Sequence, residues 1–243
     1  MILARKRFGQ HFLHDPGVIR RIVDAIAPGP EDTIVEIGPG EGALTRSLLA
    51  RAPRLEVIEI DRDLSAALAA EGIRVHAADA LAFDFSVFPP GVRIVGNLPY
   101  NISTPLLFHL ARYAQRVRDL HFMLQREVVE RMVAQPSTPE YGRLSVMLQT
   151  RFRMAKLFRV APGAFRPPPK VESAVVRMVP LGAPLGCDEK VFEQVVREAF
   201  SARRKTLRNA VAGLLDAPAL QQLGIDPGRR PETLTGREFV AIS

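Results

Sequence analysis

The tetrapeptide Asn97-Leu98-Pro99-Tyr100 holds the residue types best suited to chemistry on a planar base. The apolar run 92–96 precedes it and predicts a buried strand, so the tetrapeptide lies at that strand's carboxyl end, where α/β sheets bind ligands. Carbonyl oxygens of the Asn97 side chain and the Leu98 backbone can accept hydrogen bonds from an exocyclic amine, and Tyr100 offers a stacking face. An amine held in this way is presented as a nucleophile. An ordinary Asn–Pro turn around a core tyrosine is the alternative.

A glycine-rich turn, Glu36-Ile37-Gly38-Pro39-Gly40-Glu41-Gly42, lies upstream between an expected strand and an expected helix. Its glycines allow tight turns and close approach of a ligand, although the spacing is not the GxGxxG of dinucleotide-binding proteins. Glu59 ends the next expected strand, where an acid can bond both ribose hydroxyls of an adenosine-bearing cofactor. Asp79 follows the third strand and is placed to accept from an adenine amino group.

Short apolar strands alternate with helices from residue 33 onward, which predicts an α/β fold with a mostly parallel, Rossmann-like sheet. A helix beginning at Asp15-Pro16 precedes them. The expected strands are 33–37, 55–60, 73–77, 92–95 and 120–124, and the expected helices are 44–52, 64–70, 105–113 and 127–134. Three further strands, 144–152, 157–160 and 173–179, predict an antiparallel finish.

The stretch 180–186 is a linker by composition, and the chain beyond it is helical, with expected helices from 191, over 203–215 and over 218–223. We therefore predict one domain over 1–180 and a small C-terminal helical domain over 187–243.

The composition of the chain limits the kinds of partner and ligand that we expect it to bind. The 243-residue chain has a net charge of +7, which indicates a polyanionic partner, nucleic acid before an anionic membrane. Its single cysteine, Cys187, allows no intramolecular disulfide, and its five histidines lack metal-ligand spacing, so no metal is expected. Neither a signal peptide nor a long apolar span is present, and we expect a soluble, cytoplasmic protein that does not bind membranes. A monomer is expected because no interface stripe is visible.

Four consecutive strand ends thus carry a glycine turn, an acid, a second acid and the tetrapeptide, an order that resembles the class I S-adenosylmethionine-dependent methyltransferases. From Arg5 to about Arg208 the chain resembles the KsgA-type ribosomal RNA adenine dimethyltransferases. The motifs that carry this resemblance are Phe8-Gly9-Gln10-His11-Phe12-Leu13, Glu36-Ile37-Gly38-Pro39-Gly40, Glu59-Ile60-Asp61, Asn97-Leu98-Pro99-Tyr100-Asn101-Ile102-Ser103, Phe165-Arg166-Pro167-Pro168-Pro169-Lys170-Val171 and Arg203-Arg204-Lys205-Thr206.

The resemblance implies transfer of two methyl groups from S-adenosyl-L-methionine to N6 of each of two adjacent adenosines near the 3′ end of small-subunit ribosomal RNA, in ribosome biogenesis. It implies a cofactor site formed by His11, Leu13, Gly38, Gly40, Glu59, Ile60, Asp79, Ala80 and Asn97. It implies that Asn97, Leu98, Tyr100 and Phe165 act on the target adenine, with the two aromatic rings flanking it. Many members have asparagine in place of His11, so the resemblance implies a backbone contact there and leaves a side-chain contact open.

Two basic clusters are candidates for phosphate contacts with ribosomal RNA, or with a precursor of the small subunit. They are Arg5, Lys6 and Arg7 near the start, and Arg203, Arg204, Lys205 and Arg208 near the end. A solvated basic face is the alternative for each cluster, and the resemblance favours RNA binding.

Two other functions compete. An Erm-type methyltransferase modifies a large-subunit ribosomal adenosine with the same fold, and only Leu98 and the prolines 167–169 favour the KsgA pattern. A non-catalytic RNA-binding assembly factor could keep the fold, but the intact Gly38, Glu59, Asp79 and Asn97 argue against it. A small-molecule N-methyltransferase would leave the basic clusters without a purpose.

Overall fold

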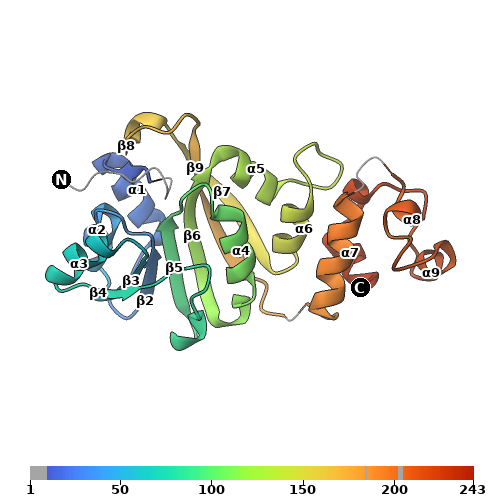
Figure 1. The fold of residues 1–243 in the computed structure, drawn as a ribbon, viewed down its shortest axis with the longest axis horizontal. Coiled ribbons are helices and arrows are strands. Elements are labelled where there is room, and N and C mark those ends of the chain that lie inside the picture. The colour runs from blue at the N-terminus through green and yellow to red at the C-terminus, as the bar shows by residue number, and fades with distance from the viewer. Residues whose placement is uncertain (1–9, 184, 202–204) are drawn as a thin grey trace. The chain divides into compact units, whose positions relative to one another are not determined.

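The computed structural model describes residues 10–183, 185–201 and 205–243 (Figure 1). The chain folds into two compact units, and the residues of each unit contact mainly one another. The first runs to Val129 and resumes over Met154–Pro180, and the second comprises Glu130–Arg153 and Leu181–Ser243. This division differs from the predicted domains, 1–180 and 187–243, because the helix α6 (Arg143–Gln149) packs with the C-terminal helices α7 (Glu189–Ser201) and α10 (Gly236–Ala241).

A seven-stranded sheet in the order β4-β3-β2-β5-β6-β9-β7 organises the first unit. The strands β4, β3, β2, β5 and β6 are parallel, and β9 pairs antiparallel with β6. The predicted parallel sheet with an antiparallel finish is therefore confirmed. The strands are β2 (Thr33–Ile37), β3 (Arg54–Glu59), β4 (Arg74–Ala77), β5 (Val92–Asn97), β6 (Val117–Gln125), β7 (Phe152–Val160) and β9 (Ser173–Pro180).

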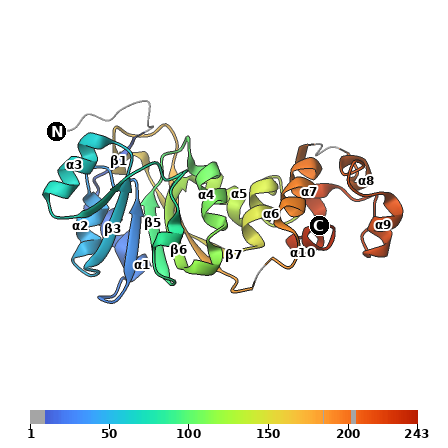
Figure 2. The same ribbon diagram turned by 60° about the horizontal axis from the view of Figure 1, so that its bottom comes forward.

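The helices α2, α3 and α4 each connect two parallel strands, and α4 lies beside β6 in both ribbon views (Figure 1 and Figure 2). The helix α1 begins as predicted, since the Asp15 carboxylate accepts from Val18 N–H and Pro16 occupies the first turn. Its Ile22, Val23 and Ile26 are buried in the core. The helices are α1 (Pro16–Ile26), α2 (Ala43–Leu49), α3 (Arg62–Ala70), α4 (Ser103–Ala111) and α5 (Arg126–Val133), and short 3-10 turns cover Phe85–Val87, Ala114–Arg116 and Pro162–Ala164.

A second, two-stranded sheet joins the N-terminal segment to a late part of the same unit. The strand β1 (Phe12–Leu13) pairs antiparallel with β8 (Phe165–Arg166), in the register Phe12↔Arg166 and Leu13↔Phe165. His14 N–H extends the attachment by donating to the carbonyl of Ala164. Strands of two residues carry no periodic pattern, so the sequence did not predict them.

The second unit is helical, with α8 (Leu207–Ala210), α9 (Ala217–Gln222) and a 3-10 turn at Pro231–Thr233 in addition to α6, α7 and α10. The predicted strand 144–152 is wrong, because its first part is helix α6 and only Phe152 belongs to a strand. Leu144, Val146 and Leu148 are all buried. A short run that is apolar on every side fits a buried helix as well as a strand.

The predicted helix 203–215 is shorter in the structure, where Lys205 lies in a bend and α8 begins at Leu207. No helix among the described residues is both long and apolar enough to cross a bilayer.

Candidate active site

A pocket in the first unit lies at the carboxyl ends of β2, β3 and β5 and extends to the loop after β4. Parallel strands all point their carboxyl ends to one edge of the sheet, so residues distant in sequence meet there. The N-terminal segment forms part of the pocket wall. The residues named from the sequence that line it are His11, Leu13, Gly38, Gly40, Glu59, Ile60, Asp79, Ala80, Asn97, Leu98 and Tyr100.

Close packing requires glycine at two positions, Gly40 in the pocket wall and Gly96 directly before Asn97. Gly40 has a φ of 58°, and a Cβ there would lie 2.9 Å from Cδ1 of Phe12. Gly96 precedes Asn97, and a Cβ there would lie 2.5 Å from the carbonyl oxygen of Ile37. These contacts let the N-terminal segment and the ends of β2 and β5 approach one another closely. Neither Phe12 nor Gly96 was predicted as a site residue, although both lie within the quoted motifs or directly beside them.

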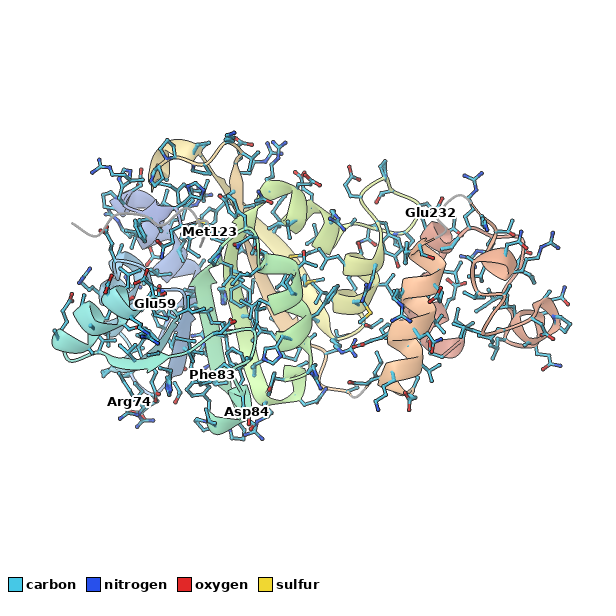
Figure 3. All side chains as sticks on the ribbon, in the orientation of Figure 1. Glu59, Arg74, Phe83, Asp84, Met123 and Glu232 are labelled. Carbon is cyan, nitrogen blue, oxygen red and sulfur yellow. The ribbon has the colours of Figure 1, made fainter. Side chains whose placement is uncertain are left out.

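Glu59, labelled in Figure 3, is 5% exposed at the end of β3. Its Oε2 accepts from Gly40 N–H at 3.3 Å and its Oε1 accepts from Asp61 N–H at 2.9 Å. Burial raises the pKa of this carboxyl group above its ordinary value, an effect opposed by these two backbone donors. Each carboxylate oxygen can accept a further hydrogen bond, so the held group has capacity for two ligand hydroxyls.

Glu36 lies deeper, at 1% exposure, and also lines the pocket. Thr45 Oγ1 donates to its Oε2 at 2.6 Å. Burial, together with the nearby charge of Glu59, raises the pKa of Glu36 to about 7, against the lowering effect of the Thr45 hydrogen bond. The sequence placed Glu36 in the glycine motif but gave it no role, and an acid at the end of a buried strand was the available signal.

The amide of Asn97 has a defined orientation. Its Nδ2 donates to the backbone carbonyl of His11 at 2.9 Å. A peptide carbonyl only accepts, so the amide nitrogen and not the oxygen must face His11. Within the described residues no group donates to Asn97 Oδ1 or to the Leu98 carbonyl, while Leu98 N–H donates to the Met123 carbonyl at 3.1 Å (Met123 is labelled in Figure 3). Two acceptors are thus left available at this turn.

Tyr100 is held at both ends. Its hydroxyl lies 2.7 Å from Oγ of Ser173, and its ring centroid lies 5.5 Å from that of His11 with a tilt of 31°. Burial raises the pKa of the phenol, so it stays neutral at ordinary pH. Ser103 Oγ donates to the Pro99 carbonyl at 2.9 Å and fixes the turn between Asn97 and α4. The site therefore combines a fixed aromatic ring with two acceptors that no described residue engages.

Comparison with known proteins identifies the family of this chain. The sequence matches the family model "Ribosomal RNA adenine dimethylase" over residues 1–242. The ribosomal RNA small subunit methyltransferase A of Aromatoleum aromaticum is 60% identical, over 99% of this chain and 93% of that protein. The protein of the same name from Chromobacterium violaceum is 58% identical, over 99% of this chain and 95% of that one. The chain belongs to the ribosomal RNA adenine dimethylase family.

Two solved structures share the architecture of this dimethylase. A dimethyladenosine transferase from Plasmodium falciparum superposes with a TM-score of 0.84 at 26% identity, covering 96% of each chain. The 23S rRNA methyltransferase ErmE superposes with a TM-score of 0.71, also at 26% identity, covering 95% of this chain and 97% of that one. The predicted class I methyltransferase fold is confirmed, and the dimethylase is an S-adenosyl-L-methionine-dependent ribosomal RNA adenine dimethyltransferase.

The pocket of the dimethylase fits that cofactor chemically. Beyond Glu59, the exposed Asp79 has Oδ1 engaged by Leu81 N–H at 2.9 Å and a second oxygen available to an adenine amine. Ile60 is 47% exposed, and an apolar side chain of this kind suits the face of an adenine ring. Ala80, next to Asp79, is buried and lines the pocket. Among the described residues, no group of three His, Cys, Asp or Glu side chains could hold a metal ion.

Phe165 differs from the expectation. The dimethylase structure places it in β8, 2% exposed, paired with Leu13 and packed in the core beneath the pocket wall. A ring so buried offers no face to a base in this conformation, so the expected flanking contact is not present here. The physical reason is the β1·β8 pairing, which turns Phe165 inward.

The basic residues are only partly described. Lys205 and Arg208 are exposed in the second unit of the dimethylase. Arg5, Lys6, Arg7, Arg203 and Arg204 lie outside the described residues. Their phosphate contacts stay predictions.

Proposed function

We propose that this dimethylase transfers methyl groups from S-adenosyl-L-methionine to N6 of two adjacent adenosines near the 3′ end of small-subunit ribosomal RNA, during ribosome biogenesis in the cytoplasm. The observation that carries the proposal is the fixed Asn97 amide, which leaves Oδ1 and the Leu98 carbonyl as neighbouring acceptors. Relatives at 58–60% identity that are named small subunit methyltransferase A support the choice of RNA.

The acceptors act on the target amine. The bound cofactor supplies an activated methyl group. The N6 lone pair of adenine is delocalised into the ring, and two acceptors that bind the N6–H groups favour a tetrahedral nitrogen with its lone pair free. The same acceptors stabilise the positive charge that develops on N6. Because Asn97 is held by His11 before any base arrives, this stabilisation needs little reorganisation.

The aromatic ring acts on the base plane. Tyr100 is fixed by Ser173 and His11, so it can stack on an adenine that has left its own stack. Single-stranded RNA loops provide such bases most readily. Stacking sets the ring orientation, and the acceptors set the position of N6 within that plane. No general base is required, because the proton released from the cationic amine passes to water.

RNA affinity comes from outside the pocket. The net charge of +7, with exposed Lys205 and Arg208, suits a phosphate backbone. We propose that the second unit binds RNA in this way and that the enzyme acts as a monomer. Identity of 58–60% with named small-subunit enzymes, against 26% with ErmE, favours the small subunit over large-subunit RNA.

The test measures labelled methyl transfer to small ribosomal subunits isolated from cells that lack these adenine methylations, with the products mapped by mass spectrometry. Dimethyladenosine at two adjacent positions near the 3′ end is expected. Naked large-subunit RNA serves as the competing substrate. Modification of that RNA alone would overturn the choice of substrate, and absence of any transfer with cofactor binding intact would favour a non-catalytic assembly factor.

A further inference from the structure

His11 is the residue at which the N-terminal segment meets the base-binding turn. Its backbone carbonyl accepts the hydrogen bond from Asn97, and its imidazole Nδ1 lies 2.7 Å from the carbonyl oxygen of Pro167. Its ring lies against that of Tyr100. One residue therefore touches both groups that are proposed to hold the target adenine.

Chemistry fixes the direction of both hydrogen bonds. The Pro167 carbonyl can only accept, so the proton of a neutral His11 imidazole is on Nδ1 and Nε2 carries the lone pair. The His11 carbonyl likewise selects the nitrogen of the Asn97 amide, which leaves Oδ1 on the opposite side of that group. The placement of the His11 main chain thus decides which atom Asn97 offers to a base.

The His11 imidazole attaches the N-terminal segment to the chain after β8, at a position that the strand pairing does not reach. The ladder between β1 and β8 ends at the pair Phe12↔Arg166, one residue short of the His11 carbonyl. The bond to Pro167 carries the attachment one residue further on both strands. The segment that follows Pro167 returns to the site at Ser173, which holds the Tyr100 hydroxyl. His11 and Tyr100 are therefore tied to the two ends of one segment and to each other.

We infer that His11 is a positioning residue for methyl transfer, whose imidazole–Pro167 bond fixes the Asn97 amide and the Tyr100 ring against the target adenine. The inference rests on the proposed function of these two residues. It assigns the His11 side chain to the base-binding half of the pocket. The resemblance had implied a backbone contact of His11 with the cofactor and had left the role of the side chain open.

Substitution of His11 by asparagine and by glutamine distinguishes a role on the base side of the pocket from a role on the cofactor side. The amide nitrogen of asparagine stands as many bonds from Cα as Nδ1 of histidine, so His11→Asn keeps a donor for Pro167. The amide nitrogen of glutamine corresponds to Nε2, so His11→Gln keeps polarity and loses that donor. We expect His11→Gln and His11→Ala to lower kcat for methyl transfer about tenfold, the effect of one lost hydrogen bond, and His11→Asn to stay within about twofold of the wild type.

Cofactor affinity, measured by calorimetry, is expected to change less than about twofold in all three variants, because the bond lies on the base side. His14→Gln is the matched control, since that histidine is exposed and the substitution keeps its backbone N–H, which donates to the Ala164 carbonyl directly before β8. Full activity of His11→Gln, or equal losses in His11→Asn and His11→Gln, would overturn the inference. A cofactor Kd that rises in parallel with the loss of kcat would return the side chain to the cofactor.

The two hypotheses fail differently. If the wild-type enzyme methylates only large-subunit RNA, the proposed substrate is wrong, and the ranking of the His11 variants on that RNA still decides the inference. If the wild type methylates small subunits and the ranking is not seen, only the inference is wrong.

Discussion

The two edges of the central sheet treat buried polar groups in opposite ways. At the amino-terminal edge, Arg93 is 3% exposed and all five of its N–H donors are used: they bond both oxygens of Asp119, one oxygen of Asp32, and the carbonyls of Ile26 and Ala27. At the carboxyl-terminal edge, Glu59 and Asn97 are each held by part of their bonding capacity and keep the rest available. A closed network stabilises the fold, and an open one is prepared for ligands.

The pKa values of a buried carboxyl group at each edge show the same contrast. Burial alone would raise the pKa of Asp119, but the neighbouring His121 and the Arg93 guanidinium lower it to about 2. At the other edge, the Thr45 hydroxyl is the only group among the described residues that donates to the Glu36 carboxylate, and burial raises the pKa of Glu36 to about 7. The amino-terminal edge of the sheet stabilises the Asp119 carboxylate. The carboxyl-terminal edge disfavours the ionised form of Glu36 as long as no cationic ligand lies beside it.

The largest expected effect is at the closed edge. Replacing Arg93 by methionine leaves Asp119 and Asp32 without their shared cation, and removal of one partner of a buried ion pair costs about 3–5 kcal/mol. Urea unfolding of the variant should show this loss of stability. The folded fraction should retain the cofactor affinity of the wild type, and a large fall in that affinity would break the contrast between the edges.

At the open edge, Asn97→Ala removes one of the two acceptors for the target amine. Loss of one preorganised electrostatic contact costs about 100- to 1,000-fold in turnover, and we expect methyl transfer to fall by that factor with cofactor binding retained. Single-turnover assays with labelled cofactor measure it. Gln222→Ala, an exposed amide at the end of α9, is the control. Near-normal transfer by Asn97→Ala would remove the central role of this residue.

The pH dependence of stability should differ in sign between the edges. Glu36 has a raised pKa, so the unfolded chain ionises first as pH rises from about 4.5 to 7, and stability falls over that window by up to about 3 kcal/mol. Asp119 has a lowered pKa, so its contribution is present above pH 4 and is lost as pH falls toward about 2. Denaturation of Glu36→Gln across pH 5–8 should show a flatter curve than the wild type, and an unchanged slope would contradict the assignment.

The smallest of these effects concerns the ribose contact. Glu59→Ala removes a carboxylate that is already held by Gly40 and Asp61, and a hydrogen bond to a charged group contributes about 1.5–3 kcal/mol. Calorimetry should show cofactor affinity reduced about 10- to 100-fold. Glu31→Ala, an exposed acid before β2, is the matched control. Unchanged affinity would place the ribose elsewhere.

Sequence patterns were sufficient for the parts of the molecule in which one simple rule dominates. Buried parallel strands are continuous apolar runs, so the runs at 33–37, 55–60 and 92–95 predicted β2, β3 and β5 closely. Residues at the ends of such strands must meet, and this topological rule brought Gly38, Glu59, Asp79 and Asn97 to one pocket.

Sequence patterns gave wrong or no predictions where contacts between distant segments determine the local structure. The run at 144–152 is apolar on every side, and the neighbouring helices α7 and α10 make it the helix α6. Phe165 was expected at the base, but its pairing with Leu13 across a two-residue strand buries it. The clash that excludes any side chain at Gly96 depends on the Ile37 carbonyl, a contact between strands that no local pattern contains.

The β1·β8 pairing has a consequence for the order of events during synthesis. His11 and Pro167 are 156 positions apart, so the wall that β1 contributes to the pocket is attached only after β8 has left the ribosome. Contacts between distant segments form late because they must first close a long loop. We expect a nascent chain that ends before residue 165 to contain the glycine turn and Glu59 and still bind cofactor weakly. An enzyme that modifies ribosomes would then gain its activity only when its own translation is well advanced.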